Sequence, residues 1–195
     1  MSTASAATKL TYDDFLRFPE DGKRHELIDG EHYVSPCPNT GHQQIAGNLY
    51  WLLRSYLESH PRGRLFFAPF DVVFSCFDVV EPDLLYLSHE RAAQALTDKN
   101  VQGCPELVIE IGSRSTRTRD VTIKRRLYER AGVTEYWVVE PRTESVRIYR
   151  RAHDGFDAPV EFAKGGSTIA SPLFPGLFIP VADVFKDAPS QRRRV

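Results

Sequence analysis

The chain has 195 residues, of which 42% are hydrophobic and 26% are charged, and its formal net charge is -1. These values are typical of one globular domain with a sizeable core. They exclude a global electrostatic attraction to nucleic acid or to an anionic membrane. Any surface that binds a polyanion must therefore come from local clusters, such as the arginines between Arg114 and Arg126 or the run at 192–194. For the run at 192–194 the alternative is a solvated tail.

The cysteines and the N-terminus indicate where the protein works. Cys37, Cys76 and Cys104 lie far apart and form no CxxC pair, which favours reduced thiols over a disulfide framework or a zinc site. No signal peptide and no apolar run of about 18 residues are present. We therefore expect a cytoplasmic protein with no membrane partner. Its expected parts are a flexible N-terminus (1–10), a single domain (11–186) and a flexible basic tail (187–195).

The first half of the chain predicts a hairpin and a long helix. In "RHELIDGEHYV" two short runs flank Asp29-Gly30, a pair suited to the positive φ angles of a type I′ turn. A helix is expected over 39–60, with Thr40 and Gln43 as a candidate capping box. Its apolar face is Ile45, Leu49, Leu52, Leu53, Tyr56 and Leu57.

The second half predicts strands around one further helix. "RLFFAPFDVVF" and "VVEPDLLYL" are strand-like and are separated by a turn at 75–78. "ELVIEI" is followed by a helix over 119–131, which Gly132 ends, and then by strands at 135–140 and 145–151. This order predicts an α/β (α+β) fold, in which helices pack on a mixed sheet.

Two carboxylates stand at the ends of these apolar strands. Since residues two apart share a face of a strand, Asp83 lies with Leu85 and Leu87, and Glu110 lies with Val108. Burying an ionised carboxylate costs several kcal/mol unless a cation or hydrogen bonds compensate. Either acid alone is more often a well-bonded structural group. Together they favour a site for Mg²⁺ or Mn²⁺, which prefer carboxylate and phosphate oxygens.

The helix after the second acid places a cation among apolar residues. At about 100° per residue, with Ile123 at 0°, Leu127 falls at about 40°, and Asp120 and Lys124 at about 60° and 100°. One interpretation is an exposed Asp120–Lys124 pair in which the lysine extends to solvent. The other is a lysine directed at the carboxylates, with a metal ion between the acids. The outward residues are expected to be Arg119, Arg125, Arg126, Glu129 and Arg130.

These residues carry a resemblance to a known family. "EPD", then "VIE" 27 positions further on, then a lysine, resembles the PD-(D/E)xK nuclease superfamily. More narrowly, "ELIDGE", "GHQQIAGNL", "EPDLLYL", "ELVIEIGSRSTRTRDVTIKRRLYERAGVTEYWVVEP" and "LFPGLFIPVADVF" are similar to the Uma-type family of "putative restriction endonucleases". The similarity covers 12–185, and it implies a restriction-endonuclease-like sheet core flanked by helices, with an N-terminal hairpin.

The resemblance also implies roles for particular residues. Asp83 and Glu110 match the metal-binding acids, Glu26 matches an acid on an N-terminal element, and the carbonyl of Ile111 matches a further metal ligand. The superfamily's lysine normally stands two places after the second acid, where this chain has Gly112. The resemblance therefore implies a lysine that has migrated to the next helix, and Lys124 fits that role.

Two further residues are implied as supporting groups. Asp120 matches the family pattern as a partner that orients Lys124. His42 matches a family position, where it either touches phosphate or hydrogen-bonds the sheet. His25 and His89 lack partners at metal-ligand spacing and are expected at the surface or at caps. Tyr136 and Trp137 are expected in the core.

The implied activity is hydrolysis of DNA phosphodiester bonds by a Mg²⁺- or Mn²⁺-dependent endonuclease. A homodimer is expected, because each chain offers one site and a duplex has two strands. The alternative is a catalytically inactive module of the same fold that binds nucleic acid or protein. No organic cofactor is expected, since GxxxxGK, GxSxG and GxGxxG are all missing from the sequence.

Overall fold

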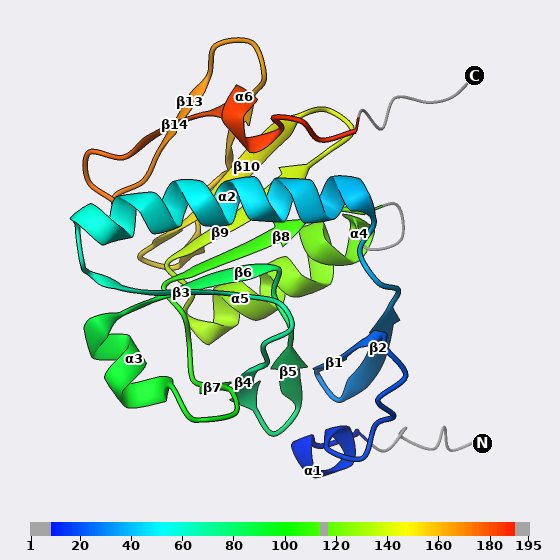
Figure 1. The fold of residues 1–195 in the computed structure, drawn as a ribbon. Coiled ribbons are helices and arrows are strands. Elements are labelled where there is room, and N and C mark those ends of the chain that lie inside the picture. Colours follow the sequence, from blue (N-terminus) through cyan, green and yellow to red (C-terminus); the bar gives the residue numbers. More distant parts are fainter. Residues whose placement is uncertain (1–8, 114–116, 190–195) are drawn as a thin grey trace, which may run out of the picture.

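The computed structural model describes residues 9–113 and 117–189. Residues 1–8 of the predicted N-terminal segment, 190–195 of the predicted tail and Arg114 lie outside the described residues. Helices cover both faces of a central mixed sheet, and a smaller sheet lies beside it (Figure 1). The predicted mixed α/β fold is confirmed.

The main sheet runs in the order β11-β10-β9-β8-β6-β3, and β12 also pairs with β10. The central pair β8 and β9 is parallel, as a strand-helix-strand unit requires, and β6 runs antiparallel to β8. The bounds of these strands are β3 Gly63–Phe67, β6 Leu84–Ser88, β8 Leu107–Ile111, β9 Glu135–Glu140, β10 Ser145–Ala152, β11 Gly155–Phe156 and β12 Val160–Ala163.

The smaller sheet holds the predicted hairpin and runs in the order β2-β1-β5-β4-β7. Asp29 and Gly30 both have positive φ, 53° and 76°, as predicted for the hairpin turn. The bounds are β1 Arg24–Ile28, β2 Glu31–Ser35, β4 Val72–Ser75, β5 Asp78–Val80 and β7 Val101–Gln102. A separate pair is formed by β13 Thr168–Ala170 and β14 Phe178–Pro180.

The two long strands predicted on either side of the turn at 75–78 are each broken in the middle. The first divides into β3 and β4 around Pro69, and the second divides into β5 and β6 around Pro82. Proline donates no backbone hydrogen bond, so a strand readily ends there. The halves next to the turn, β4 and β5, pair in the smaller sheet, whereas β3 and β6 pair in the main sheet. Asp83 lies at this crossing between the two sheets.

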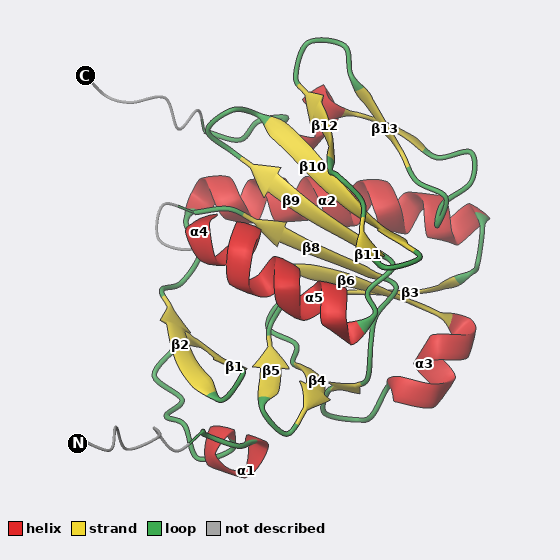
Figure 2. Cartoon of the chain, turned by 180° about the vertical axis from the view of Figure 1, so that it is seen from behind, coloured by secondary structure: helices red, strands yellow, loops and turns green. Residues whose placement is uncertain are grey.

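Two helical layers enclose the main sheet, with α2 on one face and α5 on the other (Figure 2). The helices are α1 Tyr12–Phe15, α2 Thr40–Ser59, α3 His89–Ala95, α4 Arg117–Arg119, α5 Arg125–Ala131 and α6 Val181–Val184, and a π-helical turn, η1, spans Asp120–Lys124. The predicted capping box of α2 is wrong. Asn39 is the N-cap, and its side chain accepts a hydrogen bond from the His42 N–H.

Successive residues of each central strand alternate between two hydrophobic cores. Leu84, Ile109 and Trp137 pack with α2 in one core. Leu85, Val108 and Tyr136 pack with α5 in the other. The period-two pattern therefore tells which core each strand residue enters. It places Glu110 with Val108 on the α5 face of the sheet, as predicted, whereas Asp83 stands just before β6 and contacts His42 of α2.

Candidate active site

The two predicted metal-binding acids face each other across neighbouring strands. Leu84 pairs with Ile109 in the register of β6 and β8, so Asp83 and Glu110 lie one residue further along, opposite one another. They are 3% and 2% exposed. The backbone N–H of Ile111 donates to Oδ2 of Asp83 at 2.7 Å. The strand ends thus bring both carboxylates to one point.

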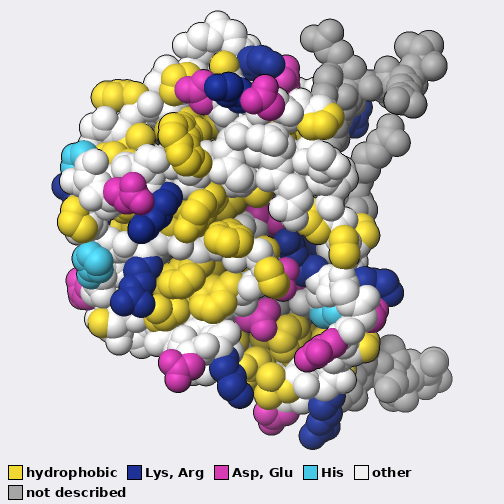
Figure 3. Space-filling view, viewed as in Figure 1, with side chains coloured by type: hydrophobic (Ala, Val, Ile, Leu, Met, Phe, Trp, Pro, Cys, Tyr) yellow, Lys and Arg dark blue, Asp and Glu magenta, His cyan; other side chains and the backbone are white. Residues whose placement is uncertain are grey.

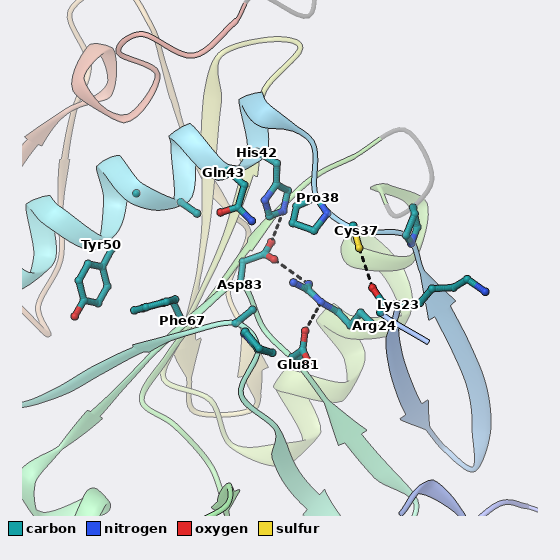
Figure 4. A pocket seen from close by; sticks show the side chains of 16 residues that line it. Lys23, Arg24, Cys37, Pro38, His42, Gln43, Tyr50, Phe67, Glu81 and Asp83 are labelled. Carbon is teal, nitrogen blue, oxygen red and sulfur yellow. Dashed lines mark hydrogen bonds and ion pairs between the residues drawn. The ribbon is translucent and has the colours of Figure 1, made fainter. Parts of the chain in front are cut away.

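Asp83 is surrounded by donors from three different elements. Arg24 of β1 donates from Nη1 to Oδ1 at 2.8 Å, and Nε2 of His42, in the first turn of α2, lies 3.0 Å from Oδ2 (Figure 4). Burial alone would raise the pKa of Asp83. The contacts with His42, Arg24 and the Ile111 N–H outweigh burial and lower that pKa to about 2. Asp83 is therefore ionised at neutral pH.

Lys124 lies between the other two acids. Its Nζ is 2.8 Å from Oε1 of Glu110 and 2.6 Å from Oε1 of Glu26. The lysine is 1% exposed, and Glu26 is completely buried. Burial would lower the pKa of Lys124, but the charges of Glu110 and Glu26 raise it instead. The lysine is thus held as a cation inside the protein, and the interpretation in which it extends to solvent is wrong.

Glu110 has a second donor on the same helical segment. The hydroxyl of Tyr128 donates to its Oε1 at 2.6 Å. Burial raises the pKa of Glu110 to about 8, although Lys124 opposes the shift. The two strand acids therefore differ widely in proton affinity, which is a feature of sites that perform acid-base chemistry.

The helix that carries Lys124 is irregular at this point. Asp120 to Lys124 form a single π-helical turn, a feature that often occurs at functional sites. Both end residues are 1% exposed, as the helical periodicity predicted. Asp120 lies close enough to Lys124 and Glu110 to raise the pKa of both.

Arg119 was expected on the outer face of this helix, and that prediction is wrong. Its Nη2 lies 3.3 Å from Oε2 of Glu26 and donates to Oγ of Ser35 at 2.5 Å. Its guanidinium also lies over the ring of Tyr33. The reason is long-range: Glu26 of β1 presents a buried carboxylate that two basic side chains of the helical segment compensate.

These side chains surround a cavity of about 210 Å³, which we call the carboxylate cavity. The polar and charged side chains that line it include Arg24, His42, Asp83, Glu110, Arg119, Asp120 and Lys124. Among the residues that the structure describes, Glu26, Glu81, Asp83 and Glu110 form ion pairs with Arg24, Arg119 and Lys124, and Asp120 lies close to Lys124.

The donor set suits a hard divalent cation. Carboxylate oxygens are the preferred protein ligands of Mg²⁺, which usually takes one or two of them and completes its shell with water and substrate phosphate. Asp83, which is ionised at neutral pH, offers such oxygens at the cavity wall. No group of three or more His, Cys, Asp or Glu side chains in the described ranges is arranged to hold a metal ion. A cation at Asp83 and Glu110 would therefore also need backbone, water or substrate oxygens.

Sequence reasoning missed three residues of this network. Arg24, which also donates to Oε1 of Glu81 at 2.7 Å, stands two places before Glu26 on the same strand. Glu81 stands two places before Asp83, and Tyr128 stands four places after Lys124. These spacings put each residue beside a predicted site residue, and this was the available signal.

The remaining candidates lie as expected. His25 hydrogen-bonds His32 and Asp21 at the surface of the hairpin, and His89 is exposed. Tyr136 and Trp137 are fully buried. Cys37, Cys76 and Cys104 are free thiols. Within 9–113 and 117–189, no helix is both long enough and apolar enough to cross a membrane.

Comparison with known proteins places the chain in a family. Among curated proteins, none matches the chain. The crystal structure of a "putative nuclease belonging to DUF820" from Anabaena variabilis is similar in fold, with a TM-score of 0.76 and 22% sequence identity over 90% of this chain and 97% of that one. The family model Uma2, described as "Putative restriction endonuclease", matches residues 12–182. This match spans most of the chain, and the chain therefore belongs to the Uma2 family.

Proposed function

We propose that this protein is a divalent-metal-dependent endonuclease that hydrolyses phosphodiester bonds in DNA. One observation carries the proposal: Asp83, Glu110 and Lys124, from separate segments of the chain, line one cavity, and Glu26 pairs with Lys124 beside it. Burying several charges on an otherwise apolar sheet is costly for folding. Such an arrangement is expected at an active site, where the buried charges take part in the reaction.

We propose Asp83, Glu110 and the carbonyl of Ile111 as the groups that hold Mg²⁺ or Mn²⁺. When bound, such a cation polarises the scissile phosphate and lowers the pKa of a water molecule. Asp83 is already ionised and needs no proton loss to bind. Glu110, with its pKa of about 8, must lose a proton for part of the population, so binding should strengthen as the pH rises toward 8.

Lys124 lines the same cavity, beside Glu110. Glu26 and Glu110 hold its ammonium in a fixed position and keep it charged. A preorganised cation stabilises the negative charge that develops on the phosphate in the transition state, and it can also orient the attacking water. Asp120, by its charge, supports the cationic form of the lysine.

Arg24 and His42 are proposed to change partners when substrate binds. Both now donate to Asp83. If a cation takes the oxygens of Asp83, these two donors become available for the phosphate oxygens of the substrate, and arginine is well suited to that contact. On duplex DNA we propose that two copies of the chain act together, which light scattering in the presence of DNA would measure.

The direct test is cleavage of plasmid DNA with Mg²⁺ or Mn²⁺, accompanied by calorimetric titration of the metal. Asp83→Asn should remove both the cleavage and the binding heat. Asp78→Asn is the matched control, because Asp78 is also a buried, ion-paired aspartate but lines neither cavity. Equal metal affinity in the wild type and in Asp83→Asn would reject the metal site.

Binding to DNA should depend strongly on salt. The exposed Arg126 and its neighbours on the outer face of α5 are proposed to contact the phosphate backbone, which releases counterions. The logarithm of the binding constant should then fall by about 0.7 to 0.9 for each phosphate contact, per tenfold rise in salt. Fluorescence anisotropy with a labelled duplex at several salt concentrations measures this slope. A flat profile would contradict DNA binding through these residues.

One observation favours the inactive-module alternative. Asp83 is already well paired by Arg24, His42 and the N–H of Ile111, so its charge is compensated without a metal ion. An inactive protein would keep this pairing as structure. Salt-dependent DNA binding without cleavage, over a range of metals and pH, would establish that alternative.

A further inference from the structure

A second and larger cavity opens directly beside the carboxylate cavity. It has a volume of about 520 Å³, and Arg24, His42 and Asp83 line both cavities. We call it the side pocket. Its other end is apolar, and the residues there are Ala46, Gly47, Tyr50, Phe67, Ala68 and Pro69. Figure 4 shows Tyr50 and Phe67 together at one end, Asp83 in the middle, and Lys23 and Arg24 at the other end.

One stripe of α2 forms a wall of the side pocket. Gln43, Ala46, Gly47 and Tyr50 stand at positions i, i+3, i+4 and i+7, which share one face of a helix. A Cβ atom added at Gly47 would meet no atom within 4 Å. The glycine therefore leaves open space in the wall, although glycine lowers helix stability in that position.

An exposed aromatic ring stands at the apolar end. Phe67, at the end of β3, is 56% exposed, and its ring packs edge-to-face on Tyr50 with 4.9 Å between centroids. Hydrophobic side chains gather on this face of the molecule below α2 (Figure 3). A large ring that is held by a second ring and still open to solvent offers a stacking surface.

We propose that the side pocket binds one unpaired nucleobase of the strand whose phosphate lies at Asp83. The inference rests on the proposed function and names its preferred substrate: nucleic acid with a single-stranded or extruded nucleotide at the cleavage site. Three features carry it. The volume suits a group of nucleotide size, the pocket shares Arg24, His42 and Asp83 with the carboxylate cavity, and its apolar end carries an exposed aromatic ring on which a base can stack.

The preference for an unpaired nucleotide follows from energetics. A base in an intact duplex must leave its stack and its pair before it can enter a pocket, whereas a single-stranded, damaged or mismatched base needs less work. Stacking on an aromatic ring works for every base, so little sequence selectivity is expected from Phe67.

The test is binding of short DNA that carries 2-aminopurine, measured without added metal. A single strand and a duplex with one mismatch should bind about tenfold more tightly than a fully paired duplex. The fluorescence of 2-aminopurine should fall on binding, because the base stacks. Equal affinity for all three DNAs with unchanged fluorescence would overturn the inference.

Four variants locate the base. Phe67→Ala should weaken single-strand binding about tenfold, in the range for loss of one stacking contact, and Phe67→Trp should keep it. Gly47→Leu should also weaken binding by filling the pocket. Leucine is the better helix former, so a melting temperature at or above that of the wild type would exclude unfolding as the cause. Trp51→Ala is the control, because Trp51 is a 66% exposed aromatic of α2 that does not line the pocket.

The outcomes separate this inference from the proposed function. Cleavage that Phe67→Ala and Gly47→Leu leave unchanged would overturn the base pocket and leave the nuclease standing. Quenched 2-aminopurine that needs Phe67, together with no cleavage under any metal, would support the base pocket and contradict the nuclease. Loss of binding in Trp51→Ala equal to that in Phe67→Ala would also count against the pocket.

Discussion

The two helical segments that cover the main sheet bury very different side chains. On one face α2 buries Ile45, Leu49 and Leu53 against the strands, as its sequence periodicity predicts. On the other face the segment of α4, η1 and α5 buries Leu127 and Tyr128, but also Asp120 and Lys124. The first helix holds the fold together by apolar packing. The second combines packing with an internal cation.

The difference shows that the second segment departs from the usual burial of apolar side chains alone. A lysine at an apolar helix position is costly unless an anion pairs with it, and here Glu26 and Glu110 do so. The strand acids and the helix lysine are each unfavourable alone and compensate one another together. Residues that are unfavourable in their own helix or strand, but that compensate one another across separate elements, are expected at functional sites.

The largest expected effect comes from removing that cation. Lys124→Met should lower the rate of DNA cleavage by about 10²-fold or more, because a preorganised charge beside the phosphate is lost. On α2, Leu53→Ala should cost about 2–5 kcal/mol of unfolding free energy but leave the rate per folded molecule unchanged. Cleavage assays corrected for the folded fraction measure both. A folded Lys124→Met protein that cuts DNA at the wild-type rate would remove Lys124 from the mechanism.

The same variant should show a stability loss that grows with pH. Lys124 is the charge that lowers the pKa of Glu110, so in Lys124→Met this pKa should rise above about 8. A carboxyl whose folded pKa lies above its unfolded value, here 4.5, destabilises the protein increasingly as the pH rises from the unfolded pKa to the folded pKa. Below about pH 8 Glu110 is protonated in both folded proteins, so the two differ through Glu110 only above that pH. We expect a loss of about 3 kcal/mol or more at pH 6 and a larger loss at about pH 9.5. Urea unfolding at both pH values measures it, and equal losses would indicate packing rather than charge.

Two tyrosine variants compare the two helical segments, because each variant removes one hydroxyl group. Tyr128→Phe removes a donor to Glu110. At about pH 9, where Glu110 is ionised, it should cost about 1.5–3 kcal/mol of unfolding free energy. Tyr56→Phe is the match on α2, because its hydroxyl donates to the neutral carbonyl of Pro175. It should cost about 0.5–1.5 kcal/mol. Chemical unfolding of both variants gives the difference, and a larger cost on α2 would reverse the comparison.

The smallest effect concerns how α2 begins. Asn39→Ala should cost about 1 kcal/mol of unfolding free energy, because the side chain caps the N–H of His42. Thr40→Ala should cost close to nothing, since Thr40 is not the cap. Thermal melts of the two variants suffice. A larger loss in Thr40→Ala than in Asn39→Ala would contradict the cap.

Much of the fold and part of the site can be predicted from local patterns of the sequence. The Asp29-Gly30 pair determined the hairpin, the apolar stripe determined α2, and the order of strand, helix and strand determined the parallel pairing of β8 and β9. Strand alternation and helix periodicity also indicated that Asp83, Glu110, Asp120 and Lys124 point inward, because a fixed angle per residue assigns each side chain to a face.

Only the tertiary structure decided which inward groups meet. Lys124 contacts Glu26 as well as Glu110, Arg119 turns inward to Glu26, and Arg24 reaches Asp83 from another sheet. The splitting of two long strands at Pro69 and Pro82, which places Asp83 between the sheets, was likewise not evident. Periodicity reports the face on which a residue lies but not the partner opposite it. That partner is set by how distant segments pack, and the energy of a buried charge depends on all its neighbours at once.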